Sequence, residues 1–375
     1  GFTDAWEQRK LGDIAEFNPK AEIPDVFEYV DLESVIGTEM VSHRQELKLT
    51  APSRAQRLAK TGDLFYQMVR PYQKNNYLYE KSDKHYVFST GYAQMRPHQD
   101  GYFLLCLVQN NNFVQIVLDN CTGTSYPAIN ANDLANIEVK YPFKSEEQVK
   151  IGMVFRSLDN LITLHQRKYD SLVNVKKAML EKMFPKNGET VPEIRFKGFT
   201  DAWEQRKLSE LGEIMTGSTP STSKTEYYSE DGIPWVTPTD INEQTICDTP
   251  RKLSEEGAKV GRVVPANTIL CTCIASIGKN TLLTVKGSFN QQINSLTPNE
   301  DNDAYFLLTE SENWSDKMKR MAASGTMQIV NKTEFSELLT RVPKLEEQEK
   351  IGTYFLNLDN LITLHQRKQF LKVRR

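Results

Sequence analysis

The residues best suited to chemistry in this sequence are basic and amide side chains gathered between His43 and Lys74. This stretch holds seven lysines and arginines but only two acidic residues. Near its end, "MVRPYQKNNY" (Met68–Tyr77) combines arginine, lysine, glutamine and asparagine around a proline. Arginine and lysine hold phosphate groups, and amide side chains form paired hydrogen bonds with base edges. The stretch therefore favours contact with nucleic acid, with a solvated polar loop beside a strand as the alternative. The candidate contact residues are Arg44, Arg54, Arg57, Arg70, Tyr72, Gln73, Lys74, Asn75 and Asn76.

A second group of candidates lies in four polar loops of the C-terminal half. Charge does not single them out, because Gly217–Lys286 holds seven basic and eight acidic residues. Amide side chains can still pair with adenine edges, and a lysine can hold a phosphate. Each loop taken alone also fits a purely structural role. The candidates are Ser218, Thr219, Ser221 and Lys224 in "TGSTPSTSK", Thr237 and Thr239 in "WVTPTDIN", Lys279 and Asn280 in "ASIGKN", and Asn290, Gln291 and Gln292 in "SFNQQIN".

Motifs for catalysis and for metal binding are missing from the sequence. There is no glycine-rich phosphate loop, no HExxH and no GxSxG. "FNPK" (Phe17–Lys20) lacks the second proline and the aromatic residue of an Asn-Pro-Pro-aromatic methyltransferase motif. The five cysteines do not have the spacing of a metal site, and Cys271 and Cys273 fit one face of a buried strand. We predict a chain without catalysis, metal or cofactor of its own, in the reducing cytoplasm.

Two repeats divide the chain into halves and must position these candidates. "GFTDAWEQRKL" occupies Gly1–Leu11 and returns unchanged at Gly198–Leu208. "EEQVKIGMVFRSLDNLITLHQRK" (Glu146–Lys168) recurs with few changes at Glu346–Lys368. The segments between the repeats look mostly unrelated. Because identical parts meet identical partners and variable parts on a common frame meet different targets, we expect two domains with one fold and different surfaces.

The second repeat has the spacing of a coiled-coil seam. Its apolar residues alternate at steps of three and four, which predicts a helix of about 40 residues and roughly 60 Å. Two such helices in one chain would pack antiparallel with pseudo-twofold symmetry. Alternatively, each apolar stripe packs on its own neighbouring domain. The predicted seam residues are Ile151, Phe155, Leu158, Ile162, His165, Leu172, Ile351, Phe355, Leu358, Ile362 and His365.

The composition fits two globular domains. The 375 residues are 39% hydrophobic and 25% charged, with a formal net charge of −3. The apolar run around Tyr102–Val108 is too short to span a bilayer, and the first residues lack a signal-peptide core. The slightly acidic balance disfavours nucleic acid only weakly, because binding depends on local patches.

Together these features resemble the specificity (S, HsdS) subunits of bacterial type I restriction-modification systems. The resemblance covers nearly the whole chain and rests on the two-half plan, both repeats, and phrases such as "IPWVTPTDI" and "ASIGKNTLL". The residues of the repeated opening and of the repeated helix segment resemble those of staphylococcal members of the family. The family implies an α/β (α+β) fold, with two mixed target recognition domains separated by two long helices that form an antiparallel coiled coil. "GDLFYQMVRPYQKN" and "STGYAQMRP" look like matching phrases of the first domain, which adds Thr90 and Tyr92 to the candidate DNA contacts.

The resemblance also implies a non-catalytic subunit that reads a bipartite, asymmetric DNA target. Its expected partners are double-stranded DNA, two modification (adenine methyltransferase) subunits and restriction subunits, and no membrane. S-adenosylmethionine, and ATP with Mg for restriction, would bind those partners rather than this chain. The expected parts are residues 1–143, the first recognition domain with its opening; 144–185, the central helix; 186–343, the linker, second opening and second recognition domain; and 344–375, a distal helix that we expect to be incomplete.

Two other functions stay open at this point. The chain could be the DNA-recognition fragment of a fused methyltransferase, or a two-headed coiled-coil scaffold that binds proteins. In each case we expect Trp6 and Trp203, with Phe2 and Phe199, to be structural. They would pack the base of each domain against an end of the helix pair rather than contact DNA.

Overall fold

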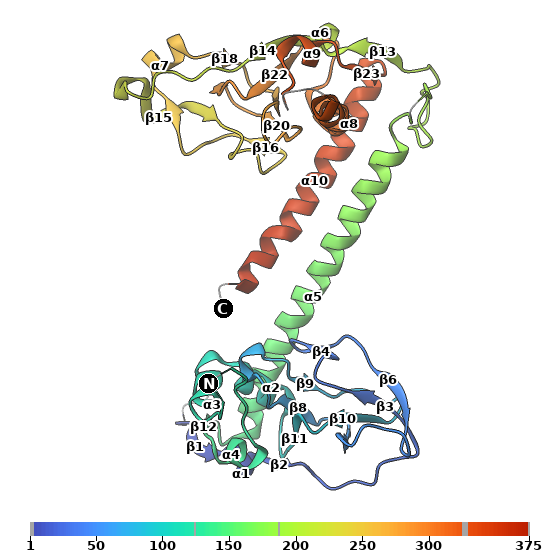
Figure 1. Cartoon of the computed structure of the whole chain (residues 1–375), viewed down its shortest axis with the longest axis vertical. Helices are drawn as coiled ribbons and strands as arrows, with labels where there is room; N and C mark the ends of the chain where they lie inside the picture. The colour runs from blue at the N-terminus through green and yellow to red at the C-terminus, as the bar shows by residue number, and fades with distance from the viewer. Residues whose placement is uncertain (1–3, 124, 187, 325–328, 374–375) are drawn as a thin grey trace. The chain divides into compact units, whose positions relative to one another are not determined.

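The computed structural model divides into two compact units, Gly1–Thr163 (unit 1) and Leu164–Arg375 (unit 2) (Figure 1). It describes residues 4–123, 125–186, 188–324 and 329–373. Phe2, one of the expected anchors, lies outside these residues. The boundary between the units falls inside a long helix, so the four domain limits expected from the sequence stay predictions.

Unit 1 contains two four-stranded sheets, built mainly from the first divergent segment. One has the strand order β2-β11-β8-β9 and the other β6-β3-β10-β7; β3 and β10 are parallel, and the other neighbours are antiparallel. The strands are β1 (Glu7–Lys10), β2 (Ala15–Phe17), β3 (Val26–Val30), β4 (Val35–Ile36), β5 (Glu39–Met40), β6 (Arg44–Leu47), β7 (Ala55–Leu58), β8 (Leu64–Gln67), β9 (Tyr77–Leu78), β10 (Tyr86–Ser89), β11 (Tyr92–Pro97) and β12 (Glu138–Tyr141). The helices are α1 (Leu11–Ile14), α2 (Gly101–Gln109), α3 (Asn111–Asp119), α4 (Ala131–Asn136) and the long α5 (Ser145–Lys182).

Unit 2 repeats this plan with one sheet of five strands and one of four. Its strand orders are β14-β22-β19-β20-β16 and β17-β15-β21-β18. The strands are β13 (Glu204–Lys207), β14 (Gly212–Thr216), β15 (Tyr228–Val236), β16 (Thr245–Ile246), β17 (Lys252–Leu253), β18 (Val263–Val264), β19 (Thr268–Thr272), β20 (Asn280–Leu283), β21 (Gly287–Phe289), β22 (Ile293–Pro298) and β23 (Leu339–Val342). The helices are α6 (Leu208–Leu211), α7 (Glu255–Val260), α8 (Ala304–Ser324), α9 (Lys332–Ser336) and α10 (Leu345–Val373).

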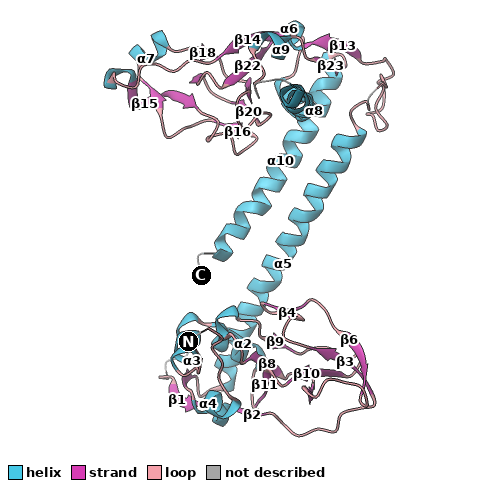
Figure 2. Ribbon diagram, viewed as in Figure 1, coloured by secondary structure: helices cyan, strands magenta, loops and turns pink. Residues whose placement is uncertain are grey.

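The two divergent segments share one topology. In unit 1, β8 pairs antiparallel with β11 and β9, and in unit 2, β19 pairs antiparallel with β22 and β20. The parallel pair β3–β10 recurs as β15–β21. Strands β8, β10 and β19 are buried at every position, so their sequences read as apolar runs without clear alternation. In Figure 2 the strands of each unit (magenta) are joined by long loops, and loops are where divergent sequence is tolerated. The expected mixed fold with two repeated domains is confirmed.

The repeated opening closes each domain at its base. Its "EQRK" residues form β1 in unit 1 and β13 in unit 2. These strands pair antiparallel with β12 and β23, which lead directly into the long helices. All four side chains of β1 and of β13 are exposed. The opening therefore joins the start of each domain to the start of its helix.

The long helices have the boundaries that their sequence requires. Acidic residues occupy the first turn of both α5 and α10, where the helix dipole favours negative charge, and Pro185 follows the end of α5. Gly152 in α5 and Gly352 in α10 lie directly against the aspartates that cap α2 and α8, and a Cβ would collide with those carboxylates. The glycine in the repeated "KIG" is thus a close-approach position.

Within unit 2, the part of α5 from Leu164 onward runs antiparallel to α10. His165 faces His365, with their Nδ1 atoms 2.9 Å apart, and Lys176 Nζ lies 2.9 Å from a carboxylate oxygen of Asp359. Rising residue numbers on α5 therefore meet falling numbers on α10, as the heptad spacing predicts. Leu172 is buried in this packing.

Both interpretations of the apolar stripe apply to α10. Ile351, Phe355 and Leu358 are buried in one core cluster with residues of α8 as well as with Leu172 of α5. Ile362 packs at the edge of this cluster, and in unit 1 Ile151 packs against the core of its own domain. The stripe thus packs against its neighbouring domain near the helix start and against the partner helix further along.

Among the described residues, every helix is too short or too polar to span a lipid bilayer.

Candidate nucleic-acid interface

The predicted "MVRPYQKNNY" loop joins β8 to β9 and has a strained backbone. Arg70 and Lys74 flank one turn of 3-10 helix, η1 (Pro71–Gln73), and both have a φ of 55°. A left-handed backbone at a residue other than glycine costs of order 1 kcal/mol and persists only where the surroundings enforce it. An isolated bridge between Val69 and Ala128 fixes the start of the loop. The loop therefore presents its side chains from a defined conformation.

Arg70 and Tyr72 of this loop are accessible, and an exposed tyrosine from another segment, Tyr126, lies beside Arg70. The guanidinium carbon of Arg70 lies 4.6 Å from the centre of the Tyr126 ring. Tyr126 is 64% exposed and Tyr72 is 51% exposed. Arg70 is not among the ion-paired arginines of the described residues. A cation beside an exposed aromatic ring, without an ion pair among the described residues, is available to a phosphate or a base edge.

The other polar side chains of this loop form hydrogen bonds within unit 1 that support it, although Gln73 is also exposed. Lys74 Nζ donates to a backbone carbonyl at the end of α2 at 2.9 Å, and Gln73 Oε1 accepts from Gln67 Nε2 at 2.9 Å. Asn75 Oδ1 accepts from a backbone N–H of the β4–β5 turn at 2.8 Å. Asn76 is 1% exposed, and its Oδ1 accepts from the backbone N–H of Gln67. The prediction of a DNA contact at Asn76 is corrected, because its amide is buried.

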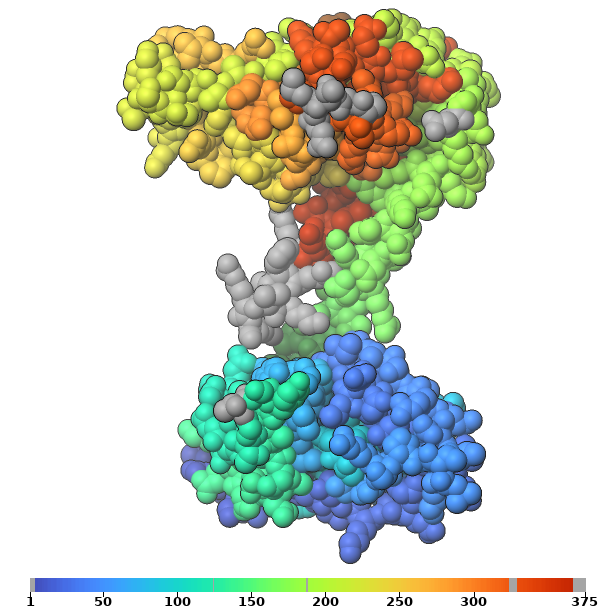
Figure 3. Space-filling model, in the orientation of Figure 1, coloured from blue at the N-terminus to red at the C-terminus, as the bar shows by residue number. Residues whose placement is uncertain are grey.

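The positive charge of the basic stretch His43–Lys74 is partly neutralised by one acidic residue inside the stretch and one outside it. Arg44 forms ion pairs at 2.8 Å with Asp31 and at 2.8 Å with Glu46. Arg57 is half-buried, and burial lowers the pKa of its guanidinium; its Nε has no hydrogen-bond partner among the described residues. Arg54 is exposed. In Figure 3 the residues of this stretch are coloured blue on the surface of unit 1.

Thr90 and Tyr92, added by the family resemblance, have different environments. Thr90 is half-buried in the turn between β10 and β11. Tyr92 is 0% exposed, packs edge-on against Phe65, and donates its hydroxyl to the Asp31 carbonyl at 3.2 Å. Burial raises the pKa of the Tyr92 phenol. The prediction that Tyr92 contacts DNA is corrected, because its ring belongs to the core.

The loop between β19 and β20 is the counterpart of this loop in unit 2. An isolated bridge between Ile274 and Ile329 fixes its start. Ala275 has a φ of 63° and Gly278 a φ of 85°, so two left-handed residues again bound the loop. Lys279 follows them and is exposed. The predicted "ASIGKN" loop of unit 2 and the "MVRPYQKNNY" loop of unit 1 thus occupy equivalent positions in their two domains.

Amide side chains near this loop divide into supports and accessible groups. Asn280 Nδ2 donates to the Ser311 carbonyl at 2.8 Å and so ties the loop to α8. Asn290 is 8% exposed, and its Nδ2 donates to Gln292 Oε1 at 3.1 Å, so its predicted base contact is corrected. Gln291 is exposed at the tip of the β21–β22 turn.

The remaining candidates of unit 2 lie in two polar loops. Ser218 Oγ accepts from a backbone N–H at 3.0 Å, and Thr219 hydrogen-bonds to the Gln291 side chain. Thr237 Oγ1 donates to a carboxylate oxygen of Asp240 at 2.6 Å. The exposed candidates are Thr219, Ser221, Lys224 and Thr239. Cys271 and Cys273 are buried as predicted, and the described residues contain no group of three or more potential metal ligands.

Tyr126 is a residue that the sequence did not single out. The segment that carries it leads into α4, where Asn130 Oδ1 accepts from the Asp133 N–H at 2.9 Å and caps the helix. Nothing in the sequence places Tyr126 beside Arg70, since the bridge between Val69 and Ala128 that brings them together is a long-range contact.

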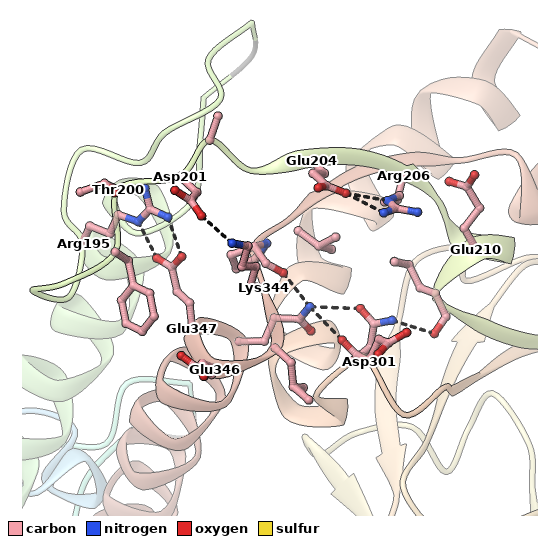
Figure 4. A pocket seen from close by; sticks show the side chains of 18 of the residues that line it. Arg195, Thr200, Asp201, Glu204, Arg206, Glu210, Asp301, Lys344, Glu346 and Glu347 are labelled. Carbon is pink, nitrogen blue, oxygen red and sulfur yellow. Dashed lines mark hydrogen bonds and ion pairs between the residues drawn. The ribbon is translucent and has the colours of Figure 1, made fainter.

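A second surface feature lies at the base of the domain in unit 2. A cavity of about 720 Å³ is lined by the linker, the repeated opening and the start of α10 (Figure 4). Asp201 pairs with Lys344 at 2.7 Å, and Arg195 donates from Nε and NH2 to the two oxygens of Glu347, both at 2.7 Å. In unit 1, Asp4 and Lys144 form the equivalent of the first pair at 2.7 Å. The repeated segments thus build the same frame twice.

Comparisons with known proteins agree with this repeated plan. The family model described as "Type I restriction modification DNA specificity domain" matches residues 3–174 and again 200–371. The HindI type I restriction enzyme specificity subunit of Haemophilus influenzae is 24% identical, over 91% of this chain and 90% of that protein. The MjaIX specificity subunit of Methanocaldococcus jannaschii is 31% identical over 43% of this chain and 38% of its own.

Solved structures support the same fold. The type I restriction-modification S subunit of M. genitalium matches with a TM-score of 0.65 at 13% identity, covering 97% of this chain and 92% of that one. A chain from a study of type I restriction-modification complex assembly has a TM-score of 0.51 at 22% identity, covering 99% and 94%. Because the family model matches both halves and most of the chain, this protein belongs to the type I restriction-modification DNA specificity family, with one specificity domain in each half.

Proposed function

We propose that this protein is the specificity subunit that reads a bipartite, asymmetric double-stranded DNA target, one part with each divergent domain. One observation carries the proposal: each unit holds a loop at the same place, bounded by two left-handed residues, with different side chains on it. In unit 1 the accessible cation is Arg70, and in unit 2 it is Lys279. Two domains of the same fold that carry different loop side chains are suited to a DNA target whose two parts differ.

The proposed contact set follows from exposure. It keeps the accessible candidates, adds Tyr126, and leaves the buried amides and Tyr92 as supports. Arg44 is kept out because its charge is already paired. The set is Arg54, Arg70, Tyr72, Gln73, Thr90, Tyr126, Thr219, Ser221, Lys224, Thr239, Lys279 and Gln291.

We assign catalysis to partner subunits. Modification subunits would bind S-adenosylmethionine and methylate adenine, and restriction subunits would use ATP with Mg. These assemblies act on chromosomal DNA, so we place the protein in the cytoplasm. A staphylococcal origin stays a prediction from the letters of the opening and helices.

The repeated strands β1 and β13 are the proposed docking sites for two modification subunits. All four side chains of each strand are exposed, and the four residues of β1 are the same as those of β13, although packing does not require this identity. Identical exposed surfaces bind identical partners, so two sites predict two copies. Reversing the charge of Arg9 alone should leave one modification subunit bound, as measured by the mass of the complex in light scattering.

The proposal is tested by modified-base sequencing of the source cell. With the gene present we expect methyladenine in one split, asymmetric sequence, and deletion of the gene should remove that methylation. Unchanged methylation after deletion would contradict the proposal. If the chain were a protein scaffold, DNA affinity would be absent or insensitive to salt, whereas phosphate contacts make affinity fall steeply as salt rises.

A further inference from the structure

The connection that follows β3 in unit 1 differs from its counterpart in unit 2. Strand β6 pairs antiparallel with β3, and β17 pairs antiparallel with β15, so the β3–β6 and β15–β17 connections are equivalent. In unit 2 the connection contains β16, which joins β20 as a parallel strand. In unit 1 it contains the antiparallel β4–β5 hairpin instead. One position in the shared fold thus carries two different structures, as expected of an element that meets different targets.

The β4–β5 hairpin is fixed both to the core and to the "MVRPYQKNNY" loop. Val35 is 0% exposed and packs in an aromatic-rich core cluster of unit 1. Gly37 begins the two-residue turn of the hairpin with a φ of 61°. Its N–H donates to Asn75 Oδ1 at 2.8 Å, and its carbonyl accepts from the Asn76 N–H at 2.9 Å. Because both asparagines belong to the loop, the hairpin lies directly beside it (Figure 1).

Ile36 is an exposed apolar side chain on this hairpin. Side chains alternate along a strand, so Ile36 points to the opposite face from the buried Val35. Ile36 is 64% exposed, and its backbone is fixed opposite Glu39 by the pairing of β4 with β5. An apolar side chain held in water in this way gains free energy when a binding partner covers it.

The charges of the hairpin do not suit contact with phosphate groups. Residues 35–40 contain no lysine or arginine. Glu39, which lies opposite Ile36, is exposed, and its carboxylate repels a phosphate. This face of the hairpin is therefore suited to base edges rather than to the DNA backbone. In the major groove, an apolar side chain identifies a base by contact with the C5 methyl group of thymine.

The equivalent connection of unit 2 carries polar side chains instead. Thr237 Oγ1 donates to Asp240, whereas Thr239 is exposed and belongs to the proposed DNA contacts. A hydroxyl group can form hydrogen bonds with several bases, but an aliphatic side chain favours the methyl group of thymine. The two connections are therefore suited to different base contacts from equivalent positions.

We propose that Ile36 determines specificity by covering the C5 methyl group of one thymine in the part of the target that the first domain recognises. The assignment rests on the proposed function and adds an uncharged residue to the contact set. Arg70 on the adjacent loop supplies a cationic contact, and Ile36 supplies an apolar contact that depends on the base. The attachment through Gly37 fixes the hairpin against that loop, so one stretch of duplex can meet both side chains.

The test removes single methyl groups from the DNA. The target is the methylated sequence found by modified-base sequencing, and its first part is the one that stays unchanged when Leu208–Pro343 is exchanged. Each thymine of that part, on either strand, is replaced in turn by deoxyuridine, which pairs with adenine in the same way and lacks only the C5 methyl group. Fluorescence anisotropy measures binding of the full chain in complex with its modification subunits. At one position we expect binding to weaken about fourfold, the effect of one methyl group that is no longer covered.

The matching variant is Ile36→Ala. It should bind the thymine duplex at least about fourfold more weakly than wild type, and should bind the thymine and deoxyuridine duplexes equally well at that position. As a control, Val26→Ala removes another exposed β-branched side chain of unit 1 and should keep both the affinity and the preference. A second control, Arg70→Ala, should weaken binding to both duplexes and keep the ratio between them.

The possible results distinguish Ile36 from the proposed function as a whole. If the wild-type complex binds thymine and deoxyuridine duplexes equally well at every position, or if Ile36→Ala keeps the wild-type preference, the role of Ile36 is overturned while the proposed function stands, because the target is still bound. A first part without thymine has the same consequence. If the wild-type complex does not bind the methylated sequence, the proposed function fails and the role of Ile36 fails with it.

Discussion

Glu310 is a buried carboxyl group that should make the stability of unit 2 depend on pH. It lies in α8 and is 5% exposed. Its Oε1 accepts from Thr340 Oγ1 at 2.6 Å and its Oε2 from Asn313 Nδ2 at 2.8 Å. These donors favour the ionised form, but burial outweighs them and raises the pKa of Glu310 to about 7.

The sign and the size of the effect follow from the two pKa values. Below about pH 4.5 the carboxyl group is protonated in both the folded and the unfolded chain, so it adds no pH dependence. Between about pH 4.5 and pH 7 the unfolded chain releases the proton while the folded chain keeps it, so folding stability falls as pH rises. A difference of about 2.5 pKa units at about 1.4 kcal/mol each corresponds to about 3 kcal/mol, an upper figure that is reached above pH 7.

The perturbation is Glu310→Gln, which keeps the shape and removes the charge. Its amide oxygen still accepts one hydrogen bond, and its amide NH2 can donate to the Thr340 hydroxyl. We expect the variant to match wild type near pH 4 and to be more stable by up to about 3 kcal/mol at pH 8. Urea unfolding followed by tryptophan fluorescence suits this measurement, because Trp203, Trp235 and Trp314 are all in unit 2.

The control is Glu230→Gln at an exposed position of unit 2. This variant should follow wild type at every pH. If wild type and Glu310→Gln keep a constant difference from pH 5 to pH 8, or if the variant loses stability relative to wild type as pH rises, then Glu310 is ionised in the folded protein and the reasoning fails.

The remaining predictions concern recognition and the frame. Arg70→Ala should weaken DNA binding of the complex by about tenfold or more, from the 1–3 kcal/mol of a good base contact, while assembly with the modification subunit is unchanged; anisotropy titrations and gel filtration measure the two. Exchanging Leu208–Pro343 for the domain of another family member should change one half of the methylated sequence, and a change in both halves would contradict the modular assignment. Gly352→Ala should destabilise unit 2 by about 1–2 kcal/mol in thermal unfolding, because the new methyl group displaces the Asp303 cap of α8. Gly152→Ala should do the same to unit 1 through Asp100.

The sequence was most informative where a pattern repeats. The two-half plan, the long helices and their antiparallel packing all follow from repeated letters and from heptad spacing. Asn130 and Asn331 each cap the short helix that follows, as the preference of asparagine for the residue before a helix leads one to expect. These features depend on local chemistry, which a sequence displays directly.

The sequence was least informative about which polar side chains are accessible. Asn76 and Asn290 look like readers of bases, but long-range packing buries both. The basic stretch looked strongly positive because its window excluded Asp31, which pairs with Arg44 across neighbouring elements. The net charge of a sequence window differs from the net charge of the surface around those residues in the folded protein. Only the surface charge determines the electrostatic potential that a phosphate encounters.

Identity between the two halves has two physical causes, and they lead to different conclusions. At Gly152 and Gly352 close packing requires glycine, because any side chain would collide with the aspartate that caps the neighbouring helix. At β1 and β13 the identical side chains are exposed, so packing cannot explain why "EQRK" is kept. A shared partner can, since a partner that must dock twice requires the same surface twice. The divergent loops obey the opposite condition, because two loops on one frame are useful for recognition only where their side chains differ.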